Sequence, residues 1–237
     1  MSQLSLNIGL LDSFEFSSFY PMPENQEIVD LLQTDFWRTF PQIFLAGDLG
    51  SGKSHLLQAA CYRIQEQGLT ASYISLRQLE RYGVRVLEGL DHQPVVFMLD
   101  DIDLVIGNLA WETALVHLLN RCRAHQQSVV LSGQYDPHEL LCVLPDLASR
   151  LVWGPTFRLK SLTAEQALAV FKKRARRRGL ELPEPVLTQI SKRFANNIQA
   201  LMQVLDKLDR VSLHKGRKIT RQLLQEIFPP ESNEVKT

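Results

Sequence analysis

Residues 42–54 read QIFLAGDLGSGKS, and this stretch decides the fold. Its first five residues are a short apolar run of the kind that forms a buried β-strand. The next eight match the pattern G-x-x-x-x-G-K-[ST], and helical spacing begins at His55. The glycines of such a loop let successive backbone N–H groups, and the positive end of the following helix, point at a phosphate. The stretch therefore predicts a phosphate-binding loop between a strand and a helix.

Two side chains of this loop have chemical roles of their own. Lys53 would neutralise the β- and γ-phosphates of a nucleotide, and the Ser54 hydroxyl would bind Mg²⁺. The alternative is a glycine-rich turn that carries a surface lysine. The predicted nucleotide-binding residues here are Gly47, Asp48, Leu49, Gly50, Ser51, Gly52, Lys53, Ser54 and His55.

A second chemical signal follows the apolar run 95–99, where Asp100 and Asp101 come next. A nucleotide-hydrolysing site needs an acid at the end of a neighbouring buried strand to hold Mg²⁺. We expect Asp100 to be that metal residue, directly or through water, and Asp101 to orient or polarise the attacking water. Strands commonly end in turns that contain aspartate, so the two aspartates alone are weak evidence for a metal site. The phosphate-binding loop upstream makes that interpretation stronger.

The rest of the chain divides into an α/β part and a helical part. Further strands are predicted at 70–75, 95–99, 128–132 and 156–159, and helices at Ser54 to Gln65 and Trp111 to Ala124. This alternation predicts a mainly parallel sheet covered on both faces. After residue 160 the patterns are helical only, at 163–178, 184–194, 198–213 and 221–228, and the first of these opens with a capping box of Thr163 and Gln166.

The sequence thus predicts four parts. These are a flexible tail at 1–12, an α/β nucleotide-binding domain at 13–160, a small helical domain at 161–230 and a second tail at 231–237.

Composition limits the classes of partner. The 237 residues contain 26 Lys and Arg and 26 Asp and Glu, so the formal net charge is zero. A zero net charge gives no long-range attraction to nucleic acid or to an anionic membrane, so any such contact must be a local patch. One candidate is the run from Lys172 to Arg178, with six cations in seven residues. It is either a solvated helix end that suits the helix dipole, or a basic patch that meets DNA or an acidic partner.

Cysteine usage and hydropathy indicate the compartment. Cys61, Cys122 and Cys142 are scattered and odd in number, which argues against a disulfide framework and against a zinc site. No run reaches the roughly 18 uninterrupted apolar residues of a membrane span, and the N-terminus lacks the basic region of a signal peptide. We expect a cytoplasmic protein with reduced cysteines and no membrane contact.

Four features together resemble the AAA+ ATPases, in the branch of the replication initiator DnaA. They are the loop, the strand ending in Asp100 and Asp101, the segment LPDLASRL at 144–151 and the helical C-terminal part, so the resemblance covers nearly the whole chain. It implies an AAA+ module with a helical lid domain, an adenine nucleotide and Mg²⁺. It also implies that Arg150 is an arginine finger that enters a neighbour's site, the alternative being a surface arginine that caps a helix.

Within this branch the chain is most similar to the short homologues of the Hda family, because the sequence stops at Thr237, directly after the lid. Hda proteins couple the sliding clamp of the polymerase to the inactivation of DnaA, and they begin with a clamp-binding hexapeptide. The chain has a similar segment, with departures at its last two positions: Gln3, Leu4, Ser5, Leu6, Asn7 and Ile8. Such an extended peptide offers a glutamine amide for a polar notch and apolar side chains for pockets.

Two positions depart from the DnaA branch near the nucleotide. Gln134 stands where the branch has an acidic sensor, and Gln199 stands where the lid offers an arginine to the nucleotide. Losing a guanidinium near the phosphates removes a charge that favours the triphosphate. We therefore expect weak or absent intrinsic hydrolysis and a preference for ADP over ATP. The segment 14–21 corresponds to the part of the branch that frames adenine, so its aromatic residues are either adenine contacts or core: Phe16, Phe19 and Tyr20.

The resemblance implies a regulator of replication initiation that is tethered to the clamp and presents Arg150 to ATP held by DnaA. One rival is an autonomous ATPase, such as a helicase-loading or clamp-loading subunit. Another is a non-catalytic clamp adaptor, for which Arg150 would not matter. AAA+ modules often self-associate through the loop and the finger, so a homodimer or a nucleotide-dependent oligomer is an open alternative to a monomer.

Overall fold

The computed structural model describes residues 14–20, 22–88, 94–195, 197–215 and 219–229. The chain divides into two compact units between Ser161 and Leu162. The predicted tails at 1–12 and 231–237, and with them the candidate clamp-binding residues Gln3 to Ile8, lie outside the described residues.

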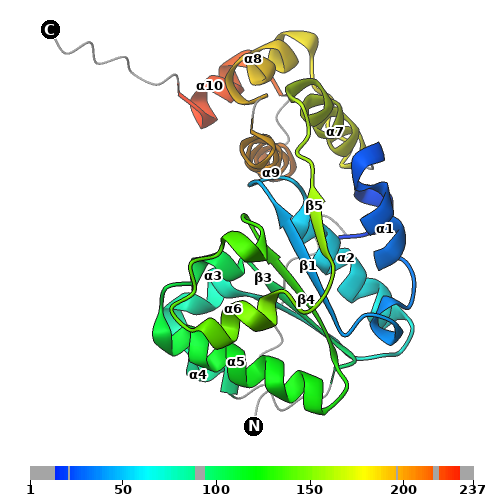
Figure 1. The fold of residues 1–237 in the computed structure, drawn as a ribbon. Coiled ribbons are helices and arrows are strands. Elements are labelled where there is room, and N and C mark those ends of the chain that lie inside the picture. The colour runs from blue at the N-terminus through cyan, green and yellow to red at the C-terminus, as the bar shows by residue number, and fades with distance from the viewer. Residues whose placement is uncertain (1–13, 21, 89–93, 196, 216–218, 230–237) are drawn as a thin grey trace, which may run out of the picture. The chain divides into compact units, whose positions relative to one another are not determined.

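The first unit is built on a five-stranded sheet in which every strand pair is parallel (Figure 1). The strand order is β2-β3-β4-β1-β5. The strands are β1 (Gln42–Gly47), β2 (Ala71–Ser75), β3 (Val96–Asp100), β4 (Ser128–Gly133) and β5 (Thr156–Leu159). The predicted parallel sheet is thus confirmed, with each strand where its apolar run indicates.

Both faces of the sheet are covered, as predicted, because successive side chains of a strand point to opposite faces. One buried cluster takes Phe44 and Leu131 from the strands and packs them under α5 (Leu109–Ala124). The other takes Ile43 and Leu45 and packs them under α1 (Gln26–Leu32) and α2 (Lys53–Glu66). Asn108 caps α5, since its side-chain oxygen accepts from the backbone N–H of Ala110 at 3.1 Å. The sheet is therefore a rigid support whose carboxyl edge carries the loop.

Several short helices of this unit have no counterpart in the periodicity of the sequence. They are α1, α3 (Leu76–Leu79), α4 (Arg85–Glu88), α6 (Pro145–Leu151) and the 3₁₀ turns Phe16–Ser18, Pro23–Asn25, Phe36–Arg38, Glu80–Tyr82, Ile102–Leu104 and Pro137–Glu139. One or two turns are too short to show a helical repeat, and such pieces depend on tertiary packing. In α6, for example, Leu147 and Leu151 are fully buried in the core under α5.

The second unit is helical, as predicted, with α7 (Ala164–Arg177), α8 (Glu184–Phe194), α9 (Ile198–Lys215) and α10 (Arg221–Ile227). The predicted capping box opens α7: Thr163 Oγ1 accepts from the N–H of Gln166 at 3.2 Å, and Gln166 Oε1 accepts from the N–H of Thr163 at 2.8 Å. Gly179 ends the helix with a φ of 70°, which glycine adopts without strain. The unit has its own core, around Phe171, Ile190 and Leu205.

The cysteines are free thiols, and Cys61 and Cys122 are buried. Burial raises the pKa of Cys61 to about 11 and that of Cys122 to about 12, so both are poor nucleophiles at neutral pH. In the part of the chain that the structure describes, no helix is long and apolar enough to cross a membrane. Within the same residues, no group of three or more His, Cys, Asp or Glu side chains could hold a metal ion.

Candidate functional site

The predicted phosphate-binding loop connects the end of β1 to the start of α2. Gly50 and Gly52 have φ values of 82° and 101°, a region that side-chain-bearing residues rarely adopt. A Cβ on Gly52 would lie 2.6 Å from Cε2 of Phe19, and one on Gly47 would lie 2.8 Å from the Leu159 carbonyl oxygen. The loop therefore needs its glycines for backbone geometry and also because Phe19 and β5 pack directly against it.

Lys53 occupies the interior of this loop. Its Nζ donates to the carbonyl oxygen of Gly47 and, at 3.1 Å, to that of Asp48, and the residue is 6% exposed. Burial lowers the pKa of Lys53, although the nearby carboxylate of Asp100 favours its charged form. A buried ammonium bonded only to neutral carbonyls is under-compensated, and a phosphate would supply the missing negative charge.

Ser51 gives a second sign that this loop fits a polar ligand. Its Oγ is buried and forms no hydrogen bond with any described residue. Buried hydroxyls without a partner are uncommon, so the atom is suited to a ligand oxygen or to a water held by one. The donors of the loop thus fit the phosphates of a nucleotide, and Ser54 stands beside them at the start of α2.

The two aspartates lie at the carboxyl edge of β3, and each has partners from neighbouring segments. Asp100, 1% exposed, accepts from Tyr73 Oη at 2.7 Å and from Ser132 Oγ. Burial and the charge of Asp100 raise the pKa of Tyr73, so the phenol remains a donor. Asp101, at a φ of 63°, accepts from Nε of Arg77 at 2.9 Å. Two hydroxyl donors thus fix the Asp100 carboxylate at the end of β3, while the carboxylate of Asp101 is engaged by a cation.

The candidate adenine-binding segment contacts the start of α2 through a small aromatic cluster. The His55 ring lies 5.5 Å from the ring of Phe14 and 5.6 Å from that of Phe19, and its Nε2 lies 3.0 Å from the carbonyl oxygen of Glu15. Phe16 is half-buried against the core under α2, and Tyr20 is 36% exposed. The structure therefore places both rings against the core under α2, and Phe19 also contacts the loop at Gly52.

The two departing glutamines lie in different units. The backbone N–H of Gln134, just after β4, donates to Oδ1 of Asp103 at 3.0 Å. Gln199 lies in the first turn of α9, in the helical unit, with an exposed side chain.

Arg150 lies near the end of α6, and its guanidinium is held against its own unit. Nε donates to Oδ1 of Asn120 at 2.9 Å, Nη1 donates to the Asp146 carbonyl oxygen at 3.1 Å, and the group forms an ion pair with the Asp146 carboxylate. Its Cζ also lies 5.2 Å from the centre of the Trp153 ring, on which Arg123 stacks at 4.5 Å. Sequence reasoning found Arg150 but none of these partners.

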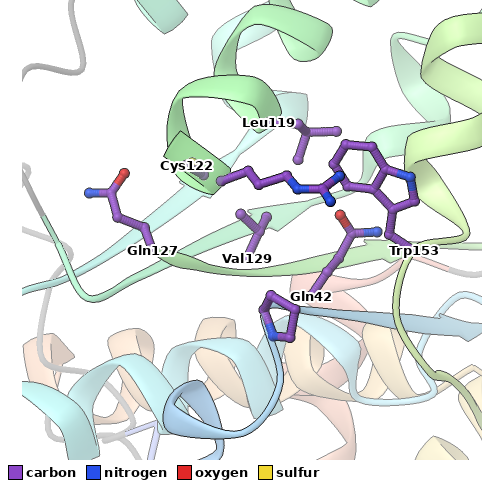
Figure 2. Close-up of a pocket in the computed structure, with 8 residues that line it drawn as sticks. Gln42, Leu119, Cys122, Gln127, Val129 and Trp153 are labelled. Carbon is purple, nitrogen blue, oxygen red and sulfur yellow. The ribbon is translucent and has the colours of Figure 1, made fainter. Parts of the chain in front are cut away.

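A cavity of about 270 Å³ adjoins this cluster at the amino ends of β1 and β4. Figure 2 shows Trp153 at one end of the cavity and Gln127 at the other, with Leu119 and Val129 between them. Gln42, the first residue of β1, also lines it, and its Nε2 donates to the carbonyl oxygen of Arg150 at 2.8 Å. This bond fixes the end of α6 to the amino edge of the sheet.

A buried carboxylate that the sequence gives no reason to single out holds the other end of α6. Glu112 is 0% exposed. Its Oε1 accepts from the backbone N–H groups of Gly107 at 2.7 Å and Val143 at 3.0 Å, and its Oε2 accepts from that of Leu144 at 2.7 Å. Leu144 is the N-cap of α6, so Glu112 ties the start of that helix to α5.

The loop geometry predicts a large effect of one substitution on nucleotide binding. Lys53→Ala should weaken ADP binding by about 10- to 100-fold, because one charge-assisted hydrogen bond to phosphate contributes roughly 1.5–3 kcal/mol. Titration calorimetry measures the change. Lys160→Ala, which removes an exposed cation of the same unit, is the matched control. Equal ADP affinity of Lys53→Ala and the native chain would contradict phosphate binding by Lys53. The stretch would then be only a glycine-rich turn that carries a lysine.

Comparison with known proteins agrees with this architecture. Residues 12–158 match the family model of the bacterial DnaA ATPase domain, and residues 164–228 match that of the Hda lid domain. Domain III of the Thermotoga maritima replication initiation protein DnaA is 21% identical, with 91% of this chain and 95% of that one covered and a TM-score of 0.73. AMPPCP-bound DnaA from Aquifex aeolicus is 20% identical, with 92% and 71% covered and a TM-score of 0.67.

The same fold occurs outside the initiators. The Thermotoga maritima RuvB Holliday junction branch migration motor is 19% identical, with 92% of this chain and 73% of that one covered and a TM-score of 0.61. At these identities the solved structures show a shared fold alone, whereas the DnaA model covers more than half of the chain. The expected AAA+ module and its lid are therefore confirmed. The chain belongs to the bacterial DnaA ATPase family, as a DnaA-homologous AAA+ protein with an Hda-type lid domain.

Proposed function

We propose that this DnaA-related replication protein promotes the hydrolysis of ATP bound to DnaA, with Arg150 as a finger that acts in trans, and so prevents re-initiation. The observation that carries the proposal is the position of Arg150. Its carbonyl oxygen is bonded to Gln42 at the start of β1, whereas the phosphate-binding loop begins at Gly47, where β1 ends. Five strand residues span about 16 Å, so the two features lie at opposite edges of the sheet.

This separation decides which site the arginine can serve. An arginine side chain is far shorter than the length of β1, so Arg150 does not reach the loop of its own chain. A second molecule that stacks its loop against α6 would receive the guanidinium beside its γ-phosphate. The fixed fork of the guanidinium stabilises negative charge that develops there during hydrolysis. The same geometry allows self-association, as a homodimer or a nucleotide-dependent oligomer, in which one copy offers Arg150 to the loop of the next.

The chain's own loop is proposed to hold an adenine nucleotide, ADP in preference to ATP. Lys53 and the buried Ser51 support phosphate binding, and the packing of Phe19 against Gly52 supports a contact of Phe19 with the ligand. Ser54 and Asp100 would hold Mg²⁺, which supplies positive charge to the phosphates when bound. Weak intrinsic hydrolysis follows from the engagement of Asp101 by Arg77 and from Gln134 and Gln199, which bring no charge to a triphosphate.

The clamp is the proposed tether. Residues Gln3 to Ile8 have the composition of a clamp-binding peptide, and a tether of this kind raises the local concentration of the finger near DnaA on the same DNA. In this proposal the protein works in the cytoplasm, beside the replicated DNA.

The proposal is tested by the release of phosphate from ATP-bound DnaA, with and without this protein, in the presence of clamp loaded on DNA. We expect stimulation with the native chain and its loss with Gln3→Ala. Persistence of DnaA-bound ATP at the rate of the untreated control contradicts the proposal. Steady turnover by the purified chain alone, lost in Lys53→Ala, would instead identify an autonomous ATPase.

A further inference from the structure

The zero net charge of the chain is the sum of two opposite charges. Residues 1–161 contain 11 Lys and Arg against 18 Asp and Glu, a formal net charge of −7. Residues 162–237 contain 15 Lys and Arg against 8 Asp and Glu, a formal net charge of +7. The helical unit taken alone is therefore strongly basic for its size, which the composition of the whole chain conceals.

The run from Lys172 to Arg178 is divided by α7 between two sides of the helix. Arg178 turns inward, where its Nη1 lies 2.9 Å from Oδ1 of Asp206 and 3.5 Å from Oδ2 of Asp209 on α9. Arg174 also faces α9, with Nη1 3.3 Å from Sδ of Met202. These two arginines hold α7 to the core of its unit, so they are structural.

Of the four remaining cations of the run, Lys172 is half-buried and the other three face outward. Lys173, Arg176 and Arg177 are exposed, and their spacing of three and four residues puts them on one side of the last turns of α7. The C-terminus of a helix carries partial negative charge, which favours cations there. That effect explains a cation in the last turn, but it does not explain three exposed cations on a unit of charge +7.

We infer that this exposed side of α7, defined by Lys173, Arg176 and Arg177, binds the phosphate backbone of duplex DNA. Regularly spaced phosphates match cations placed on successive turns, and two of the three are arginines, whose fork suits phosphate oxygens. The inference is independent of the proposed function, because it needs neither DnaA nor Arg150.

The apolar surface favours nucleic acid over an acidic protein as the occupant. Among the described residues of the helical unit, none is a large apolar residue with an exposed side chain, whereas the first unit exposes several, such as Leu141 at 88%. A protein interface has an apolar centre beneath its polar rim, and a membrane-bound surface needs apolar anchors. Contact with a phosphate backbone needs neither, since cations and hydrogen bonds suffice.

The salt dependence of binding gives the size of the expected effect. Three phosphate contacts give a slope of about −2.7 in a plot of log K against log salt, so that binding weakens about 40-fold between 50 and 200 mM salt. The probe is a short fluorescent duplex of mixed sequence, titrated with the full chain and followed by anisotropy. We expect the variant Lys173→Gln/Arg176→Gln/Arg177→Gln to bind the duplex more weakly at 50 mM salt and to lose this part of the slope.

A matched variant distinguishes binding by this side of α7 from a general effect of the net charge of the chain. Arg81→Gln/Arg85→Gln/Arg158→Gln removes the same charge from exposed residues of the first unit, and it should bind like the native chain. Thermal melting of both variants confirms that each is folded. Absence of duplex binding at 50 mM salt, an equal loss in both variants, or polyglutamate that competes as well as DNA would overturn the inference, the last by identifying an acidic protein as the partner class.

Discussion

Replacing Arg150 with alanine is expected to slow the hydrolysis of DnaA-bound ATP in the clamp-dependent reaction by about 10³-fold or more, the range in which arginine fingers contribute to phosphoryl transfer. The physical reason is the loss of a fixed cation beside oxygens that gain negative charge in the transition state. The side chain is partly exposed and its contacts lie at the end of a short helix, so the fold should survive. Single-turnover phosphate release measures the rate.

Two further variants make this result specific. Arg150→Lys keeps the charge without the planar fork, and it should recover only a small part of the stimulation. Arg123→Ala removes the other guanidinium that stacks on Trp153, and it should retain most of the activity. Clamp binding should be unchanged in all three. A chain with alanine at position 150 that stimulates hydrolysis as well as the native one would identify a non-catalytic adaptor.

Replacing Glu112 with alanine is expected to lower the free energy of unfolding by about 3–5 kcal/mol. The change leaves the backbone N–H groups of Gly107, Val143 and Leu144 without their acceptor in the protein interior, and each unsatisfied buried donor costs roughly 1–3 kcal/mol. Part of that cost is recovered by water entering the space. Urea unfolding followed by circular dichroism measures the loss.

A control variant and a conservative variant of Glu112 test whether the lost hydrogen bonds cause this decrease in the free energy of unfolding. Glu27→Ala removes an exposed carboxylate, and its effect should stay within about 0.5 kcal/mol. Glu112→Gln keeps one acceptor oxygen but turns donor hydrogens toward other donors, so an intermediate loss is expected. A loss below about 1 kcal/mol for Glu112→Ala would mean that the three N–H groups find other partners and that the carboxylate does not hold α6.

The sequence predicts those parts of this protein that depend on local patterns. The strands follow from apolar runs, and the phosphate-binding loop follows from its glycines and its place after β1. The helix at 184–194 is found with the bounds that its spacing indicates, and α7 opens at the expected capping box. In each case neighbouring residues carry the whole signal.

The partners of the site residues are not predictable in this way. Tyr73 and Ser132 both donate to Asp100 because neighbouring parallel strands bring these side chains together. A tyrosine or a serine in a strand does not by itself indicate that it will bond to a buried carboxylate. Asn120 reaches Arg150, and Glu112 reaches Leu144, only after α6 has packed under α5. The charge of the helical unit, by contrast, follows from the sequence once the chain is divided near residue 161, where the change from strand patterns to helical patterns also puts the boundary.

The resting contacts of Arg150 have a consequence for selectivity. To extend toward a neighbour, the guanidinium must leave Asn120, Asp146 and the Trp153 ring. This costs about 2 kcal/mol for two solvent-accessible hydrogen bonds, one partly exposed ion pair and one cation–π contact. Roughly one molecule in 30 would therefore extend the arginine unaided. A neighbour that holds a triphosphate can offset this cost with one or two charged hydrogen bonds, whereas one that holds a diphosphate lacks the terminal group. In the proposed reaction, the resting contacts of Arg150 would therefore act as a threshold, through which the chain distinguishes neighbours by the charge of the nucleotide they hold.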